Sequence, residues 1–256
     1  MKKELCHSLA ELSDLEQMPI KSQAYYKGFR AIKKLSEEEI LKRKGFQDIE
    51  GIGPSLNKKI LEFIKTGKIA KLEAYKAQPS IKKKKSGDII RISAEEAWSY
   101  IKPLEDSLLY LPFVTKFAVC GSLRRKKATV ADADILVCTG NSEQVWQALK
   151  IILANQKKNV TAEGNRKISL TEGHGFQIDI SFCSTQEWGA SLLHFTGSSR
   201  FNVYCRQIAK NRGWSLNQYG LWEANGVGTN RIPDAETEEE ILEKLGLEYE
   251  PPEERF

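Results

Sequence analysis

The sequence lacks the features that build a disulfide framework, a zinc site or a membrane span. Its five cysteines are odd in number and include no C-x-x-C pair, and its three histidines have no metal-ligand spacing. No run of about eighteen apolar residues could form a transmembrane helix, and acidic residues already occur in the first turns, unlike in a signal peptide. We therefore expect an intracellular protein with reduced cysteines and no membrane partner, located in the cytoplasm or, in a eukaryote, in the nucleus.

Charge is unevenly divided along the 256 residues, which are enough for one or two domains with a sizeable core. Residues 1–91 contain 21 Lys and Arg against 12 Asp and Glu, a net charge of +9, whereas residues 92–256 contain 18 against 22, a net charge of −4. A solvated lysine-rich surface would explain the basic part as well as nucleic-acid binding does. Of the two parts, the basic one is still the better candidate for a nucleic-acid footprint.

Breaks in the hydrophobic pattern predict the organisation of the chain. Apolar periodicity indicates helices over residues 1–77, and the polar, basic stretch QPSIKKKKSGD predicts a linker at 78–88. A helix from residue 92 then leads into strands at about 114–120, 130–138, 167–171 and 176–182, and helices return from residue 190. The expected fold class is α+β, with an all-helical domain (1–77), a domain that contains the strands (89–189) and a C-terminal subdomain that begins with helices (190–256).

Three aspartates on two predicted strands suggest a metal site. Asp132 and Asp134 alternate with apolar residues in VADADILVC, and Asp179 does so in FQIDISF, so side-chain alternation would put the first two on one sheet face. Carboxylates that close repel one another unless a cation lies between them. A lone D-x-D is more often an edge feature, but three such aspartates suit Mg²⁺ and two-metal phosphoryl transfer.

A Gly-Ser turn with two arginines, GSLRR, precedes these aspartates. Gly121 would let the backbone approach a phosphate, Ser122 would donate a hydrogen bond, and Arg124 or Arg125 would pair with phosphoryl oxygens. Together with the aspartates, this turn predicts a nucleotide site.

The basic part contains the pattern of a helix-hairpin-helix, IEGIGPSLNKKI. Gly51 and Gly53 would close the turn and direct backbone N–H groups at a phosphate, and Pro54 suits the first position of the following helix. Five lysines follow the turn, which favours sequence-independent binding to a nucleic-acid backbone: Lys58, Lys59, Lys65, Lys68 and Lys71.

Three segments resemble the X-family DNA polymerases related to polymerase beta, within the nucleotidyltransferase superfamily. They are GSLRRKKATVADADILV at residues 121–137, HFTGSSRFNVYCRQIAKNRGWSLNQYGLW at 194–222 and GIGPSLNKKILEFIKTGKIAKL at 51–72. The resemblance implies a lyase-like helix-hairpin-helix domain, a nucleotidyltransferase palm with a mixed β-sheet and helices, and a C-terminal α/β thumb.

For the palm, the resemblance implies metal ligands and a triphosphate site. Asp132 and Asp134 would bridge two Mg²⁺ ions, for which Mn²⁺ can substitute, and Asp179 would hold the catalytic ion and orient the primer 3′ oxygen. The residues implied at the incoming nucleotide are Gly121, Ser122, Arg125 and Arg91. Ala131 replaces a glycine usual in the family, and its methyl group would narrow the pocket.

For the thumb, the resemblance implies contacts to the nucleotide and to the nascent base pair. Phe195, Gly197 and Asn202 would contact the dNTP, and Arg206 and Tyr219 would contact DNA; contacts at the minor-groove edge check pair geometry without reading sequence. His194 stands where the family commonly has tyrosine, and Gln218 replaces a glutamate.

For the N-terminal domain, the resemblance implies a 5′-deoxyribose phosphate lyase site. Lys59 aligns with the Schiff-base lysine, although it could equally be a plain DNA-contacting residue. Lys21, Tyr25 and Lys71 align with the 5′-phosphate pocket, whereas Ser55 replaces a lysine. The hairpin glycines Gly51 and Gly53 would bind DNA, and a monovalent cation is a candidate ligand there.

One family module is missing, because only a short stretch separates the helical domain from Arg91 and leaves no room for the second helix-hairpin-helix. We predict a compact, monomeric DNA polymerase that fills short gaps in base excision or end-joining repair. Its substrates would be dNTPs and gapped or nicked double-stranded DNA with a 5′-phosphate. The alternatives are a template-independent or ribonucleotide-tolerant transferase, and a non-catalytic DNA-end-binding protein.

Overall fold

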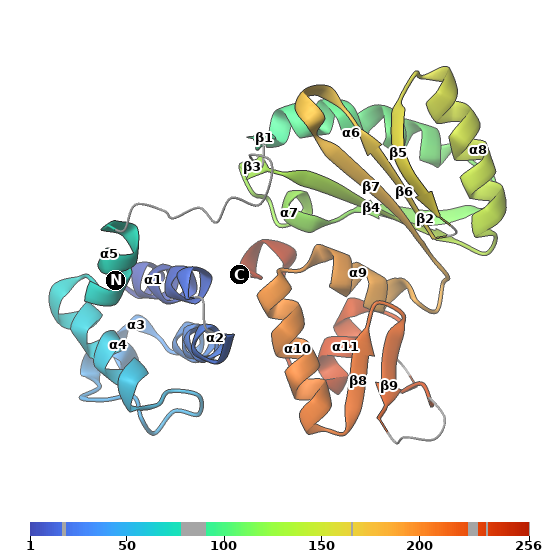
Figure 1. The fold of residues 1–256 in the computed structure, drawn as a ribbon. Coiled ribbons are helices and arrows are strands. Elements are labelled where there is room, and N and C mark those ends of the chain that lie inside the picture. Colours follow the sequence, from blue (N-terminus) through green and yellow to red (C-terminus); the bar gives the residue numbers. More distant parts are fainter. Residues whose placement is uncertain (17–18, 78–90, 165, 225–229, 234, 256) are drawn as a thin grey trace. The chain divides into compact units, whose positions relative to one another are not determined.

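A computed structural model describes the chain except for residues 17–18, 78–90, 165, 225–229, 234 and 256 (Figure 1). It divides into two compact units, Met1–Ser86 and Gly87–Phe256. The predicted linker at 78–88 lies outside the described residues. No described helix has the length and apolar character that crossing a membrane requires.

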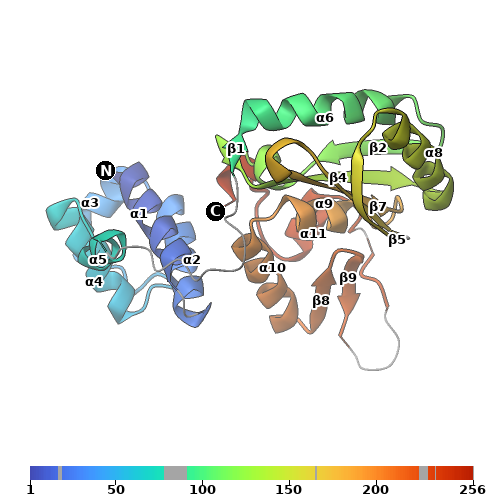
Figure 2. The same ribbon diagram turned by 45° about the horizontal axis from the view of Figure 1, so that its top comes forward.

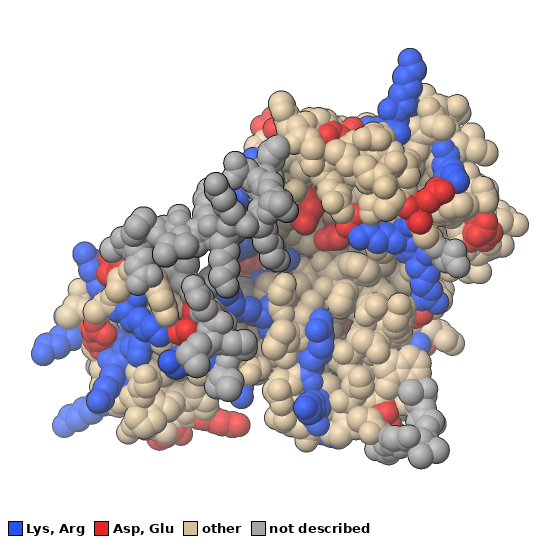
Figure 3. Space-filling view, in the orientation of Figure 1, with Lys and Arg blue, Asp and Glu red and all other residues tan. Residues whose placement is uncertain are grey.

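The N-terminal unit is helical throughout its described secondary structure. Its helices are α1 (Lys2–Leu15), α2 (Pro19–Lys34), α3 (Glu37–Lys42), α4 (Pro54–Thr66) and α5 (Ala70–Ala77). Leu9 and Leu12 of α1 and Ile60 and Phe63 of α4, which the helical periodicity marks as apolar positions, are buried in its core. Lys and Arg side chains are spread over the visible face of this unit (Figure 3).

The C-terminal unit contains a five-stranded mixed sheet in the order β2-β4-β7-β6-β5. Its strands are β2 (Val114–Val119), β4 (Asp132–Thr139), β5 (Asn159–Gly164), β6 (Lys167–Thr171) and β7 (Gln177–Cys183). The central pair β4 and β7 is parallel, and every other pairing in the sheet is antiparallel. The short strands β1 (Ile92–Ser93) and β3 (Thr129–Val130) form a separate antiparallel pair.

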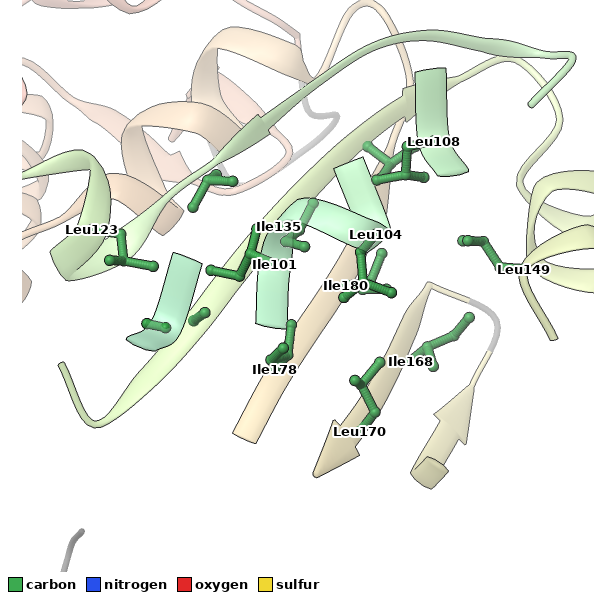
Figure 4. Close-up of a cluster of buried hydrophobic side chains, with 14 of the residues drawn as sticks. Ile101, Leu104, Leu108, Leu123, Ile135, Leu149, Ile168, Leu170, Ile178 and Ile180 are labelled. Carbon is green, nitrogen blue, oxygen red and sulfur yellow. The ribbon is translucent and has the colours of Figure 1, made fainter. Parts of the chain in front are cut away.

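Helices cover both faces of this sheet (Figures 1 and 2). On one face, α6 (Ala94–Leu109) and α8 (Ser142–Asn155) supply Ile101, Leu104 and Leu149 to a core with Ile135 and Ile178 of the strands (Figure 4). On the other face, α9 (Trp188–Thr196) packs Leu192 against a smaller cluster that includes the later residues of β4 and β7. The first residues of these two strands are not part of that smaller cluster.

The chain then continues through elements that pack around α9. They are α10 (Ser199–Asn211), the antiparallel hairpin β8 (Trp214–Asn217) and β9 (Gly220–Glu223), and α11 (Glu238–Lys244). Short turns of helix lie at α7 (Gly121–Arg124), η1 (Gly173–Gly175) and η2 (Pro252–Glu254).

The predicted α+β fold class is confirmed, and the predicted strand positions agree closely with β2, β6 and β7. The strand predicted at 130–138 is interrupted at Ala131, so that Val130 belongs to β3 and Asp132 begins β4. The sequence reading missed β5, whose residues are mostly exposed and therefore lack an apolar alternation. The expected α/β character of the C-terminal subdomain agrees with the hairpin of β8 and β9, but the positions of these two strands were not predicted.

Candidate active site

The three predicted aspartates lie on one face of the sheet, on its two central strands. Asp134 of β4 is the register partner of Asp179 on β7. Ala133 and Ile178 point into the core beneath α6 and α8, so Asp132, Asp134 and Asp179 point to the opposite face. They stand at the beginning of each strand, ahead of the residues that α9 covers.

The predicted Gly-Ser turn lies directly against Asp134. The N–H of Cys120 donates to the Asp134 carbonyl at 2.7 Å, which places α7 beside the beginning of β4. Gly121 has a φ of +61°, and a Cβ there would lie 2.8 Å from Asp134 Oδ2. Only glycine accommodates both this conformation and this approach, so the turn and the aspartate form one structural feature.

A pocket opens beside the turn and contains most of the predicted triphosphate residues. It is lined by Arg91, Ser122, Arg125, Lys127, Ala128, Thr129, Ala131 and Asp132. The Arg91 guanidinium donates to the Thr129 carbonyl at 2.6 Å, which connects β1 to β3 next to the pocket. Lys127 was missed by the sequence reading; the basic run RRKK after the Gly-Ser turn was the available signal.

Repulsion and burial perturb Asp134. Burial, together with the neighbouring charges of Asp132 and Asp179, raises the pKa of Asp134 to about 7, although Lys167 and Arg125 oppose the shift. Asp134 is therefore a carboxylate whose negative charge the protein alone compensates poorly.

Asp179 has the opposite electrostatic environment. Burial by itself would raise its pKa, but hydrogen bonds from Lys167, Ser169 and Gln177 outweigh burial and hold the pKa below the ordinary value. Ser169 Oγ and Gln177 Nε2 donate to Oδ1 at 2.6 and 2.8 Å, and Lys167 Nζ lies 2.8 Å from Oδ2.

The donor set suits a hard divalent cation, because it consists of carboxylate oxygens and carries an excess of negative charge at Asp134. In the arrangement observed, however, no three His, Cys, Asp or Glu side chains among the described residues are grouped so that they could hold an ion. Both oxygens of Asp179 accept hydrogen bonds from the protein instead.

Two arginines after the Gly-Ser turn join it to α9 and α11. Arg125 donates to the carbonyl of Thr196, and Arg124 donates to the hydroxyl of the same residue at 2.5 Å. Arg124 also forms an ion pair of 2.6 Å with the buried carboxylate of Glu238, which the fully buried Arg255 contacts at the same distance. Arg124 is therefore a structural link between the two subdomains, and Glu238 and Arg255 were missed by the sequence reading because they lie far along the chain.

Three residues predicted in the thumb contact His194: Phe195 and Asn202, expected at the nucleotide, and Arg206, expected at DNA. Asn202 Nδ2 donates to the His194 carbonyl at 2.7 Å, and Arg206 lies 3.5 Å from its Nδ1. Burial and, to a smaller extent, the Arg206 charge lower the pKa of His194. The rings of His194 and Phe195 meet edge to face, with centroids 5.1 Å apart.

Gly197 and Tyr219, the other two predicted residues of the thumb, each lie next to an arginine. Gly197 terminates α9 with a φ of +70°, and a Cβ there would lie 3.1 Å from a terminal nitrogen of Arg125. Tyr219 lies in the turn between β8 and β9, where the Arg166 guanidinium is 5.1 Å from its ring centroid. Arg166 also pairs with Glu187, the residue before α9, at 2.8 Å, so it contacts both the start of α9 and this turn.

In the N-terminal unit, the structure brings Lys59 and Lys71 to the same tyrosine. The Lys59 and Lys71 ammonium groups lie 5.8 and 5.2 Å from the centroid of the buried Tyr25 ring. Lys59 also donates to the hydroxyl of Ser55 at 3.1 Å. Lys21 is exposed on α2, and no contact of its side chain with this group is observed among the described residues.

Lys71 is already paired with a carboxylate that the sequence reading missed. Its ammonium lies 2.6 Å from Glu16, whose side chain is 5% exposed, and it donates to the Tyr25 hydroxyl at 3.0 Å. Burial would lower the pKa of Lys71, but the hydrogen bonds that its ammonium donates to Glu16, Tyr25 and Tyr75 outweigh burial and raise the pKa. Lys71 therefore stays charged, but part of its charge is compensated within the protein.

The hairpin before α4 has the geometry that its glycines predict. Gly51 has a φ of +89°, and Gly53 is the N-cap residue of α4, with Pro54 in the first turn. Their exposed positions leave the backbone of the turn accessible.

Comparisons with known proteins match both units. A family model described as DNA polymerase beta thumb matches residues 191–256, and one described as a helix-hairpin-helix domain matches residues 1–69. The DNA polymerase/3′-5′ exonuclease PolX of Bacillus subtilis (strain 168) is 30% identical over 220 residues, 85% of this chain. The chain belongs to the X family of DNA polymerases.

Two further relatives of this X-family chain are matched over 53% of its length. DNA polymerase lambda of Rattus norvegicus is 31% identical over 159 residues, and the repair DNA polymerase X of African swine fever virus (isolate Tick/South Africa/Pretoriuskop Pr4/1996) is 29% identical over 140 residues. The matched regions span 35% of the bacterial relative, 28% of the mammalian one and 79% of the viral one. The chain thus corresponds to about a third of the first two relatives.

Proposed function

We propose that this chain is a DNA-directed DNA polymerase that fills short gaps during DNA repair. The observation that carries the proposal is the placement of Asp132, Asp134 and Asp179 on one sheet face, directly beside the Gly121–Ser122 turn and its arginine-lined pocket. This combination provides carboxylates for metal ions and cations for a triphosphate within one site, as nucleotidyl transfer requires.

Asp132, Asp134 and Asp179 would hold two Mg²⁺ ions, for which Mn²⁺ can substitute. When bound, the ions neutralise charge on the triphosphate and lower the pKa of the attacking hydroxyl. Asp179 orients the primer 3′ oxygen toward the α-phosphorus. The 3′ hydroxyl loses its proton to solvent, and its oxygen forms a bond to the α-phosphorus. The bond between the α-phosphorus and the oxygen that bridges to the β-phosphate breaks, and pyrophosphate leaves.

The pocket residues bind the triphosphate of the incoming dNTP. Ser122 donates through its hydroxyl, and Arg91 and Arg125 supply guanidinium groups that can pair with two phosphoryl oxygens at once. Lys127 adds a third cation at the same pocket. Gly121 allows this turn to approach Asp134 closely enough for the triphosphate to lie beside the metal ligands.

The thumb tests the geometry of the nascent base pair. Phe195 and Gly197 pack beneath the sugar, and Asn202, Arg206 and Tyr219 contact the minor-groove edge, where hydrogen-bond acceptors are similar in every base pair. Asn202 is nine-tenths buried and held by the His194 carbonyl, which supports a fixed position for its side chain.

The N-terminal unit binds the downstream side of a gapped or nicked duplex. The hairpin glycines Gly51 and Gly53 present backbone N–H groups to the phosphate backbone, where a monovalent cation can assist, and Lys21, Tyr25 and Lys71 bind a 5′-phosphate. Lys59 is the candidate nucleophile for a 5′-deoxyribose phosphate lyase step. We further propose that the protein is monomeric and intracellular, because its substrates are DNA and dNTPs.

The experiment is primer extension with Mg²⁺ on a short gap carrying a downstream 5′-phosphate, compared with an open primer-template. We expect strong preference for the gap, because the segment between the helical unit and Arg91 leaves no room for a second primer-gripping module. Asp179→Ala should abolish extension, whereas Asp106→Ala, at an exposed aspartate of α6, should not. Equal extension of both substrates would reject the gap-filling proposal, and extension by Asp179→Ala would reject the site.

A further inference from the structure

The geometry points to Lys167 as a positioning residue that pairs with one carboxylate oxygen of Asp179 and competes with a divalent cation for that oxygen. The inference deepens the proposed function and rests on it for the role of Asp179. It starts from the observation that Asp179, on the same sheet face as Asp132 and Asp134, has side-chain contacts to both of its carboxylate oxygens.

Strand register creates the arrangement around Asp179. Ser169 on β6 is its direct register partner, Lys167 lies two residues before Ser169, and Gln177 lies two residues before Asp179 on β7. Because side chains alternate, all four point to the same sheet face. The carboxylate therefore has three donors that come from its own sheet rather than from a loop.

The donors divide between the two oxygens of Asp179. Ser169 and Gln177 both donate to Oδ1, at 2.6 and 2.8 Å, whereas Lys167 contacts Oδ2 at 2.8 Å. The two neutral donors fix the plane of the carboxylate without adding charge. Lys167 supplies a positive charge at the oxygen that remains, where it competes with a metal ion for the same lone pairs.

The two partners differ in how easily they can move. The Lys167 side chain is 51% exposed, and the Asp179 side chain is 16% exposed. Lysine has a flexible stem and a strongly hydrated ammonium group, so Lys167 can leave for solvent while Ser169 and Gln177 keep the carboxylate in place. Metal binding then requires loss of one ion pair, whose lysine is half exposed, and no movement of the strand.

The size of the effect follows from this exposure. Solvent screens the exposed ammonium of Lys167 and weakens its pairing with Asp179, so competition by Lys167 should lower metal affinity by about two- to fivefold. The ion pair between Lys167 and Asp179 should therefore weaken metal binding without preventing it.

The test is a titration of the whole chain with Mn²⁺ alone, without DNA or dNTP, in which the electron paramagnetic resonance signal of free Mn²⁺ measures binding. Only the sites lost in Asp179→Asn are assigned to Asp179. We expect Lys167→Gln to bind Mn²⁺ at these sites about two- to fivefold more tightly, and Lys167→Arg to resemble the wild type. Lys150→Gln is the matched control, since Lys150 forms a comparable ion pair with Glu163 on the same domain, at 3.1 Å, and it should leave Mn²⁺ affinity unchanged.

Unchanged or weaker Mn²⁺ binding by Lys167→Gln, or no Asp179-dependent site in that variant, would overturn the inference. Primer extension by the wild type is measured separately. If Lys167→Gln tightens Mn²⁺ binding but the wild type does not extend a primer, the proposed function fails and the competition stands. If the wild type extends a primer but Lys167→Gln does not tighten binding, the function stands and the competition fails.

Discussion

Replacing Asp134 by asparagine should stabilise the metal-free protein, and by more at high pH than at low pH. The pKa of Asp134 in the folded state is raised to about 7 from 3.8. Between these two pH values the folded state keeps a proton that the unfolded state has released, so the unfolding free energy of the wild type falls as the pH rises. Asparagine has no charge to repel Asp132 and Asp179, and this contribution to the pH dependence disappears.

The raised pKa of Asp134 determines the size of the expected change in unfolding free energy. At 1.36 kcal/mol per pKa unit, full ionisation in the folded state costs about 4 kcal/mol above pH 7. Between pH 5 and pH 8 the stability advantage of Asp134→Asn should therefore grow by about 2.5 kcal/mol. For a unit of this size, that corresponds to about 5–10 °C in the thermal midpoint.

Tryptophan fluorescence is a suitable assay, because all five tryptophans lie in the C-terminal unit: Trp98, Trp146, Trp188, Trp214 and Trp222. Thermal unfolding is followed in EDTA at pH 5 and pH 8 for the wild type and Asp134→Asn, with Asp106→Asn as the exposed control. If the thermal midpoints of the wild type and Asp134→Asn differ by the same amount at both pH values, the pKa of Asp134 is not raised as the structure implies.

Three further predictions concern single positions. Gly121→Ala places a methyl group against Asp134 at a left-handed backbone position and should slow gap filling at least about tenfold; an unchanged single-turnover rate would contradict the close approach. Lys59 should be trapped by borohydride on a 5′-deoxyribose phosphate end, and an adduct that persists in Lys59→Ala would assign the lyase nucleophile elsewhere. His194→Tyr should increase discrimination against ribonucleotides, measured as the ratio of dNTP to rNTP incorporation; identical ratios would mean that this side chain does not contact the sugar.

The sequence predicted those parts of the site that depend on local pattern. Alternation along single strands indicated the shared face of Asp132 and Asp134, and the glycine in G-S-L-R-R indicated a close backbone approach. Lys167 and Ser169 were not predicted, because their contact with Asp179 depends on which residues of β6 and β7 face each other, and a register shift by one residue would point them away.

Long-range partners were missed for a similar reason. Glu16 pairs with Lys71 across 55 residues, and Glu238 pairs with Arg124 across 114. Neither carboxylate has a local pattern that distinguishes it from a solvated surface residue, and only the packing of the helices brings it to its partner. The sequence therefore gave no sign that Glu16 compensates part of the positive charge of Lys71 in the basic N-terminal unit.

The measurement that tests the central claim most directly is single-nucleotide incorporation into a gap, with each of the four dNTPs opposite each of the four template bases, in the presence of Mg²⁺. A template-directed polymerase should incorporate the complementary dNTP in each case, and Asp179→Ala should incorporate none. Incorporation that ignores the template base would indicate a template-independent transferase, and no incorporation by the wild type with Mg²⁺ or Mn²⁺ would contradict the assignment of Asp132, Asp134 and Asp179 as a catalytic site.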